Sequence, residues 1–449
     1  MAYMKRITSF LIVFIILLTP YDVYGKSKDF MGKKESKLDI TAKGAVLIEE
    51  KTGKVLYEKD SHKHLYPAST TKILTALVAI ENGDLEEMVT VGDEIDMIKE
   101  GSSTAGLVKG ERISLVNLLR GLLIPSGNDA AYTIAVYTAR RVSKDEKMDS
   151  NEATKLFVSM MNERAKKAGA KDSNFINPHG FHDEKHYSTA YDLGVIAGEA
   201  MKNKTFREIV NTQYYEMPIE MGIPSIGKGI THKWTNTNEL IKEKGRYFYK
   251  YTNGIKTGHT TPAGYCLVSY AKNNGLDLIG VILNTTPSGQ WIDSTSLLNY
   301  GFSNYEFYKI TEPGKKVESM AVDNPSSKDN MEFFALSNGQ ICELMYKGDI
   351  PGIKVDFEWD KKFFDIKKSG EKMHLKKTIS KDDIIGRATF SINGKTLGET
   401  KLIADRSVKK SKKTIYIVDC EIPTWIIFAV LGLIIVLRFC KRRPTRRRR

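Results

Sequence analysis

The chain has 449 residues, 41% of them hydrophobic, which is enough for two or three domains with packed cores. Its formal net charge is +14, but residues 422–449 contribute eight positive charges and residues 1–25 a net +1, so only +5 remains for the rest. This mild excess, without a dense basic stripe, argues against a nucleic-acid partner. The four cysteines show neither metal-ligand spacing nor a disulfide framework, so we expect no metal and no cofactor.

The N-terminus has the pattern of a secretory signal peptide. Lys5 and Arg6 precede an apolar run over residues 10–18, and small residues follow near Gly25. We therefore predict a signal peptide over residues 1–25, with an uncleaved N-terminal anchor as the alternative. Residues 26–37 are polar and lysine-rich and are predicted to form a flexible lead-in.

The next segment is predicted to be a β-hairpin followed by a helix. Apolar runs at 44–48 and 55–57 flank a turn at 51–53. Ser69-Thr70-Thr71-Lys72 then precedes an apolar helical run. On a helix start, Ser69 and Lys72 lie one turn apart, so the amine can reach the hydroxyl. The free amides of the helix N-terminus would favour a developing negative charge beside Ser69.

A second polar motif follows an amphipathic helix. Leucines recur over residues 115–124, and Pro125 ends that helix. Ser126-Gly127-Asn128 then forms a turn before another apolar helical start. Further helices are predicted over residues 151–168 and 189–201.

The third motif, Lys256-Thr257-Gly258, begins a strand-rich stretch. Strands are predicted at 267–270 and 278–283, and a last helix at 297–302. A sheet built from both ends of residues 38–308, with helices between them, predicts an α+β fold.

Beyond this domain the pattern changes twice. Short alternating runs such as 353–357 and 388–392 predict a β-rich domain over residues 309–415. Residues 422–440 are apolar, and a helix of that length would be roughly 28 Å long, which suits a transmembrane helix. The basic tail 441–449 would then lie in the cytoplasm, so we expect a single-pass cell-membrane protein whose catalytic domain is extracytoplasmic.

The three motifs, in this order, resemble those of D-alanyl-D-alanine carboxypeptidases, the low-molecular-mass penicillin-binding proteins (serine peptidase family S11). The stretches 123–131, 175–182 and 186–193 are similar to that family as well. The resemblance implies a penicillin-binding-protein/β-lactamase-like peptidase fold. It also implies a serine peptidase that removes the terminal D-alanine from peptidoglycan stem pentapeptides, is acylated by β-lactams, and serves cell-wall synthesis and remodelling.

The resemblance and the chemistry of the motifs assign roles to eight residues. A serine hydroxyl needs a base within hydrogen-bonding reach to act as a nucleophile. The expected catalytic residues are Ser69 as nucleophile, Lys72 as base, Ser126 as proton relay and Asn128 as hydrogen-bonding partner. The expected substrate-binding residues are Lys256, Thr257, Gly258 and His259, the last supplying an oxyanion-hole amide with Ser69.

One position departs from the family pattern. The resemblance predicts an arginine just before residues 291–302 that helps to recognise the substrate carboxylate, but Gln290 stands there. We therefore expect carboxylate binding to depend more heavily on Lys256 and Thr257, or the preferred substrate to differ.

Several alternatives share the same motifs. A β-lactamase would need a deacylating carboxylate, and no glutamate-centred segment matches one. A non-catalytic β-lactam receptor would be acylated without releasing D-alanine, but the short basic tail holds no signalling domain. Endopeptidase or transpeptidase activity on the same site stays open.

Overall fold

A computed structural model describes residues 38–218, 222–223, 228–229, 231–328, 331–366 and 372–412. The predicted signal peptide, lead-in, transmembrane helix and basic tail all lie outside these residues. Within the described ranges, no helix is long and apolar enough to cross a membrane. The chain divides into two compact units, which are described separately: one reaches Tyr308 and includes Glu343–Gly352, and the other holds Lys309–Cys342 and the residues from Ile353 onward.

The first unit is built on a five-stranded antiparallel sheet with the order β2-β1-β11-β10-β9. The predicted hairpin and the predicted strands at 267–270 and 278–283 are confirmed as parts of this sheet. Its strands are β1 (Gly44–Glu49), β2 (Val55–Lys59), β9 (Thr252–Thr260), β10 (Gly264–Asn273) and β11 (Leu276–Thr285).

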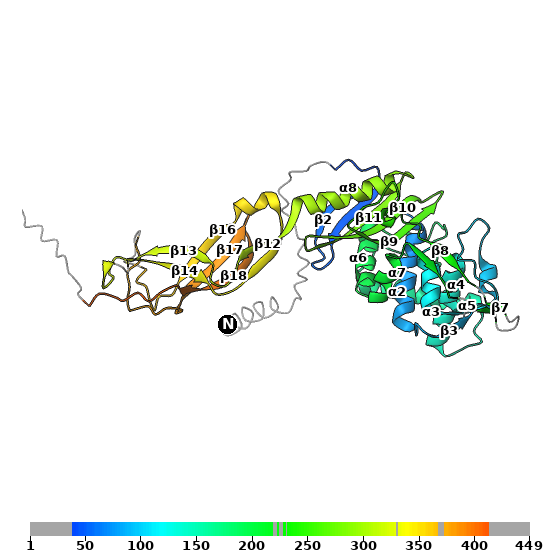
Figure 1. The fold of residues 1–449 in the computed structure, drawn as a ribbon, viewed down its shortest axis with the longest axis horizontal. Coiled ribbons are helices and arrows are strands. Elements are labelled where there is room, and N and C mark those ends of the chain that lie inside the picture. The colour runs from blue at the N-terminus through cyan, green and yellow to red at the C-terminus, as the bar shows by residue number, and fades with distance from the viewer. Residues whose placement is uncertain are drawn as a thin grey trace, which may run out of the picture. The chain divides into compact units, whose positions relative to one another are not determined.

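Both faces of the sheet are covered by helices, which explains why the inner strands β1 and β11 are mostly apolar rather than alternating. In β1, Val46 and Ile48 enter one apolar cluster while Ala45 and Leu47 enter another on the opposite face. Helix α8 (Gly289–Asn304) covers the second face, and α6 (Ala190–Met201) covers the first, with α2 (Lys72–Asn82) packed against α6 (Figure 1).

The remaining elements lie between β2 and β9 in the sequence. The predicted helices at 115–124, 151–168 and 189–201 are confirmed as α3, α5 and α6. The other elements are η1 (Ala68–Thr71), β3 (Met88–Thr90), η2 (Asp93–Met97), β4 (Arg112–Ser114), α3 (Leu115–Leu123), α4 (Asn128–Ser143), α5 (Ser150–Ala168), α7 (Lys204–Val210), β5 (Tyr214–Glu216), β6 (Gly222–Ile223), β7 (Lys228–Gly229), β8 (Lys233–Thr235) and η4 (Glu239–Ile241).

Helix α8 begins eight residues before the predicted start at 297. Its first turns carry a buried carboxylate, Asp293, which accepts hydrogen bonds from Thr41 N (3.0 Å), Ala42 N (2.9 Å) and Thr285 Oγ1 (3.0 Å). A buried face that is polar interrupts the apolar periodicity from which helices are predicted.

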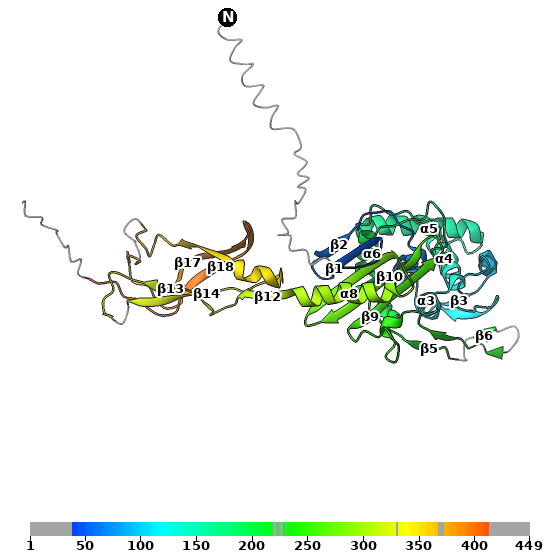
Figure 2. The same ribbon diagram turned by 90° about the horizontal axis from the view of Figure 1, so that it is seen from above.

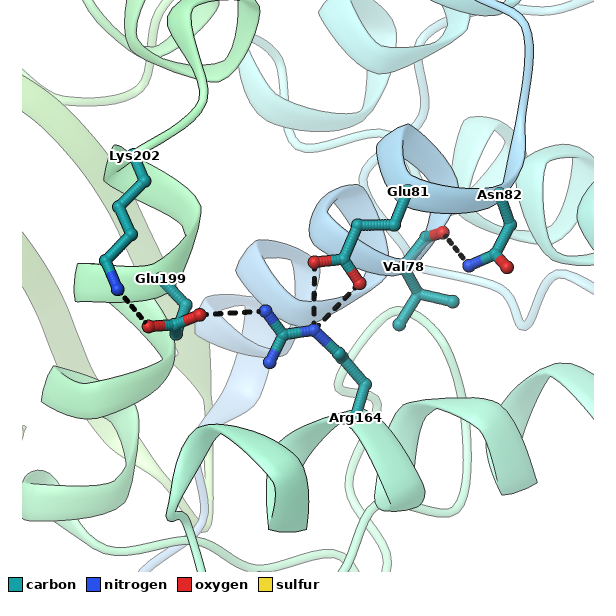
Figure 3. A network of polar contacts seen from close by, with 6 residues as sticks. All are labelled: Val78, Glu81, Asn82, Arg164, Glu199 and Lys202. Carbon is teal, nitrogen blue, oxygen red and sulfur yellow. Dashed lines mark hydrogen bonds and ion pairs between the residues drawn. The ribbon is translucent and has the colours of Figure 1, made fainter.

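Three helices of the first unit are joined by a polar network around Arg164 of α5 (Figure 3). The Arg164 guanidinium donates to Glu81 of α2 at 2.7 Å and to Glu199 of α6 at 3.0 Å. Glu199 also pairs with Lys202 at 2.5 Å. Because the Arg164 side chain is only 13% exposed, this network is more shielded from solvent than an ordinary surface ion pair.

The second unit is all-β, as predicted. It contains an antiparallel sheet with the order β13-β14-β18-β17-β16, of which Figure 2 labels β13, β14, β17 and β18. Asn393 and Gly394 both have positive φ in the turn between β17 and β18. Its core includes Phe333, Phe364, Leu375, Ile385 and Leu402. The strands are β13 (Lys316–Ala321), β14 (Glu332–Ser337), β16 (Lys354–Trp359), β17 (Ile384–Ile392) and β18 (Lys395–Ala404).

Between β14 and β16 the chain returns to the first unit. Strand β15 (Ile341–Tyr346) pairs with β12 (Tyr305–Thr311) and is followed by η6 (Lys347–Gly352). Sequence reasoning treated residues 309–415 as one continuous segment. Glu343–Gly352 nevertheless groups with the first unit, because Leu344 is buried in the apolar cluster beneath α8 and its carbonyl accepts a hydrogen bond from Lys54 Nζ (3.0 Å).

Candidate active site

Ser69 lies in the tight turn that leads into α2. Ala68 just before it has a positive φ of 48°, a conformation that an alanine rarely adopts. The Thr70 hydroxyl donates to the Pro67 carbonyl at 2.7 Å and closes the turn. Lys72 begins α2, one turn after Ser69, and its Nζ lies 2.9 Å from Ser69 Oγ.

Lys72 Nζ is held by three polar contacts in a buried position. Besides Ser69 Oγ, it donates to Asn128 Oδ1 at 2.7 Å and to the backbone carbonyl of His179 at 2.9 Å. An ammonium group has three donors and a neutral amine has two. When Lys72 is neutral, the Asn128 and His179 oxygens can accept both N–H groups, which leaves the lone pair directed at the Ser69 hydroxyl.

The surroundings of Lys72 favour the neutral amine. Burial, followed by the positive charge of Lys256, holds the pKa of Lys72 well below its ordinary value, while Asp129 acts in the opposite direction. A lysine in this state can serve as a general base near neutral pH.

The loop that supplies the His179 carbonyl fits closely against the Ser69 turn. The Asn177 side chain accepts a hydrogen bond from Gly180 N at 2.7 Å and bends the loop. Gly180 has φ +86°, and a Cβ there would lie 1.8 Å from the Ala68 carbonyl oxygen. Only glycine fits at this position, so Gly180 is a requirement of the site.

His186 stabilises the Ser69 turn through Thr71. Its Nδ1 accepts a hydrogen bond from Ile176 N (3.2 Å), so its Nε2 carries the proton and donates to Thr71 Oγ1 (2.9 Å). Burial lowers the pKa of His186 to about 4, so the ring is neutral at physiological pH. His186 therefore orders the loop beside the site.

Ser126 is held in a strained turn between α3 and α4. Its φ is 70°, and its carbonyl accepts a hydrogen bond from Ser103 Oγ at 2.7 Å. Asn128 N donates to the Ser103 carbonyl at 2.8 Å, and Gly127 N donates to Gly121 O at 2.9 Å. These bonds fix the turn that carries the second motif, at a backbone cost of about 1–3 kcal/mol for the strained residue.

Asp129 anchors the loop that faces this turn. Its buried carboxylate accepts hydrogen bonds from Ala105 N (2.7 Å), Gly106 N (2.9 Å) and Leu107 N (3.0 Å). A carboxylate bound by three amides is a rigid support. Sequence reasoning did not select Asp129, although its position directly after the Ser126-Gly127-Asn128 motif was a usable signal.

The third motif lies on β9 directly beside the Ser69 turn. A Cβ on Gly258 would lie 2.9 Å from Pro67 O and 3.1 Å from Ser69 N, so the glycine permits this close approach. Lys256 is buried, and burial lowers its pKa to about 7. Its Nζ contacts the Thr257 carbonyl (3.2 Å) and Thr257 Oγ1 (3.4 Å).

The structure thus brings Ser69, Lys72 and Asn128 into direct contact and sets β9 beside them. Ser126 lies in the turn two residues before Asn128, and the exposed His259 ring lies against Tyr265 with a centroid distance of 4.2 Å and an interplanar angle of 30°. Gln290 is buried, and its Nε2 donates to the Pro287 carbonyl at 3.0 Å within the first turn of α8. Its amide nitrogen is therefore already engaged inside the protein.

Comparisons with known proteins agree with this geometry. A family described as D-alanyl-D-alanine carboxypeptidase matches residues 31–287, and one described as the C-terminal domain of penicillin-binding protein 5 matches residues 305–410. The D-alanyl-D-alanine carboxypeptidase DacF of Bacillus subtilis is 32% identical over 418 residues, which cover 91% of this chain and 96% of DacF.

Solved structures give the same result. The Streptomyces K15 DD-transpeptidase is 33% identical, with a TM-score of 0.54, over 59% of this chain and 98% of its own. Penicillin-binding protein 5 from Haemophilus influenzae is 26% identical, with a TM-score of 0.55, over 83% of this chain and 98% of its own.

Proposed function

The chain belongs to the D-alanyl-D-alanine carboxypeptidase family, and from this membership we propose how the residues of the site divide the reaction among them. The protein is a serine-type D-alanyl-D-alanine carboxypeptidase of cell-wall metabolism. The proposed substrate is the peptidoglycan stem pentapeptide, whose terminal D-Ala-D-Ala bond is broken through an acyl-enzyme on Ser69.

Acylation begins with proton transfer from Ser69 to neutral Lys72. The observation that carries this assignment is the set of three contacts at Lys72 Nζ, which directs its lone pair at Ser69 Oγ. Ser69 Oγ then attacks the carbonyl carbon of the penultimate D-alanine and forms a tetrahedral intermediate. The backbone amides of Ser69 and His259 are the proposed oxyanion hole, and loss of one such donor typically costs about 3 kcal/mol.

Breakdown of the intermediate needs a proton on the leaving nitrogen. Ser126, in the turn beside Asn128, is the proposed relay from Lys72 to that nitrogen. The C–N bond breaks, D-alanine leaves, and the acyl group stays on Ser69. Water, activated by the same lysine, then hydrolyses the ester and regenerates the enzyme.

Substrate binding and base activation are coupled through Lys256. A terminal carboxylate close to Lys256 and Thr257 would favour the protonated form of Lys256, whose pKa is about 7 in the free protein. The charge on Lys256 in turn favours the neutral form of Lys72. The bound substrate would therefore favour the neutral form of Lys72, which takes the proton from Ser69.

β-Lactams are proposed to acylate the same serine, because their strained amide and carboxylate resemble the D-Ala-D-Ala terminus. A second candidate activity is transpeptidation, in which an amine takes the place of water at the acyl-enzyme. It is favoured by the similarity to a Streptomyces K15 protein whose solved structure carries the name DD-transpeptidase.

We further propose that the protein is secreted through residues 1–25 and held at the cell membrane by residues 422–440. The support is the sequence pattern alone: an apolar segment of transmembrane length followed by a tail rich in arginine. Fractionation of cells that produce the full-length chain and a variant ending at residue 420 would test the anchor. Retention of the shortened variant in membranes would contradict it.

The activity is tested by incubating the full-length chain and its Ser69→Ala variant with a D-Ala-D-Ala-terminated stem peptide. We expect release of free D-alanine by the parent protein and none by the variant. Labelling by fluorescent penicillin without any release of D-alanine would favour the receptor alternative. Product containing an added amine acceptor would show transpeptidation.

A further inference from the structure

Thr237 lies in a short segment that is fixed on both sides by buried asparagines. Asn236 Nδ2 donates to the Thr212 carbonyl at 2.9 Å, and Asn238 Oδ1 accepts from Leu240 N at 3.0 Å. Both asparagines are buried, whereas Thr237 between them is exposed. The segment therefore holds one hydroxyl outward on a rigid backbone.

Thr237 connects the second and third motifs. Its backbone N–H donates to the Ile124 carbonyl at 3.2 Å, two residues before Ser126. Its hydroxyl lies 2.6 Å from the Thr257 hydroxyl on β9. The Thr237 side chain is thus at the substrate-facing end of Lys256-Thr257-Gly258, although it is 19 residues earlier in the sequence than Lys256.

The two hydroxyls have donor capacity to spare. Each threonine hydroxyl has one proton and two acceptor positions. Their mutual hydrogen bond uses one proton, so one of the pair can donate to a ligand, and both can do so when the mutual bond opens. Thr257 Oγ1 also lies 3.4 Å from Lys256 Nζ, which places a cation next to the pair. Two hydroxyl donors beside an ammonium group suit a carboxylate.

The position of Gln290 increases the importance of this pair. Gln290 is buried, carries no charge, and already donates one N–H to the Pro287 carbonyl, so it cannot supply the charged contact that an arginine would make. The terminal carboxylate must find its hydrogen bonds among the remaining donors of the site, and Thr237 is exposed and already in contact with Thr257.

We propose that Thr237 is a substrate-binding residue that donates a hydrogen bond to the terminal carboxylate of the stem peptide, together with Thr257 and Lys256. Thr237 thereby makes the enzyme selective for a free carboxyl terminus. This inference rests on the proposed function, since it names a contact of the same substrate in the same site.

The experiment compares full-length Thr237→Val with full-length Thr235→Val. Valine keeps the shape of threonine and removes only the hydroxyl. Thr235 is an exposed residue of β8, two positions away, and serves as the matched control. Each protein is assayed with a D-Ala-D-Ala-terminated peptide and with its C-terminal carboxamide, and separately for acylation by benzylpenicillin and by benzylpenicillin methyl ester.

For the carboxylate peptide, we expect Thr237→Val to lower kcat/KM by about 10- to 100-fold, mainly through KM, which is the usual effect of losing one hydrogen bond to a charged group. Rates with the carboxamide and the methyl ester should change by less than about threefold, and Thr235→Val should resemble the parent. An equal loss on charged and uncharged ligands would show a merely structural role and overturn the proposal, as would no loss at all.

The proposed function and this inference can fail independently. If the parent protein releases no D-alanine, the proposed function fails, but the penicillin pair still reports whether Thr237 discriminates a carboxylate from its ester. If the parent protein is active and Thr237→Val keeps the parent's preference, the inference fails and the carboxypeptidase stands.

Discussion

Replacing Asn128 by aspartate changes one atom and places a negative charge against Lys72. Asn128 Oδ1 lies 2.7 Å from Lys72 Nζ in a buried position. Two unit charges at that separation attract by about 6 kcal/mol at an effective dielectric constant of about 20. Burying the new carboxylate offsets several kcal/mol of this attraction. A net stabilisation of protonated Lys72 by about 3 kcal/mol would remain, equivalent to a factor of about 100.

The variant should therefore fold normally and acylate slowly. We expect Asn128→Asp to react with fluorescent penicillin more slowly than the parent, by about 100-fold on the acid limb of the rate profile, where Lys72 is protonated in both proteins. The acid limb of its rate profile should move to higher pH by about two pH units, because the base must lose its proton before it can act. The assay is a stopped-flow acylation rate between pH 5 and 10, accompanied by the thermal midpoint.

Asn82→Asp is the matched control, since Asn82 is an exposed residue at the C-terminal end of α2, the helix that Lys72 begins, and it donates to the Val78 carbonyl (Figure 3). Its profile should match that of the parent. A rate and an acid limb for Asn128→Asp that equal those of the parent would refute the assignment of Lys72 as the base.

Three further predictions follow from other contacts. Gly180→Ala should destabilise the protein by several kcal/mol and abolish acylation, because its Cβ would overlap the Ala68 carbonyl; thermal unfolding and penicillin labelling would check this, and a stable, active variant would contradict it. The KM for a carboxylate peptide should rise about tenfold per pH unit above pH 7, because Lys256 loses its proton through its pKa of about 7; a KM that is constant up to pH 9 would count against a charged Lys256. Arg164→Met should lower the free energy of unfolding by about 1–3 kcal/mol and leave the acylation rate unchanged, since its carboxylate partners lie away from Ser69. Chemical denaturation measures the free energy of unfolding, and penicillin labelling measures the acylation rate. A slower acylation would show that the network also positions α2.

Most of the fold was predictable because its elements carry strong local patterns. The hairpin of β1 and β2, helices α3, α5 and α6, and the inner strands β10 and β11 all follow from apolar periodicity and turn residues. Helix α8 was predicted only in its second half, since buried Asp293 satisfies backbone amides far away in the sequence. The return of Glu343–Gly352 to the first unit had no local signal, because it depends on the packing of Leu344.

The residues of the site that belong to short sequence motifs could be predicted. Those that depend on contacts between distant segments of the chain could not. Ser69, Lys72 and Asn128 come into contact as their spacing and order suggested. The His179 carbonyl could not be selected from the sequence, since any residue offers a carbonyl and only the loop geometry brings this one to Lys72. The proposed role of Thr237 could not be predicted from the sequence either, because it depends on the contact between its hydroxyl and that of Thr257.

The return of Glu343–Gly352 makes the peptidase unit discontinuous in the sequence. Leu344 shares an apolar cluster with Leu56 and Leu276, so a chain cut after Tyr308 would leave part of that cluster uncovered. A chimera that exchanges the two units at a single junction would inherit this exposed surface and a tendency to aggregate. A chimera of two such proteins should therefore fold when both the peptidase segment and the segment equivalent to Glu343–Gly352 come from the same parent.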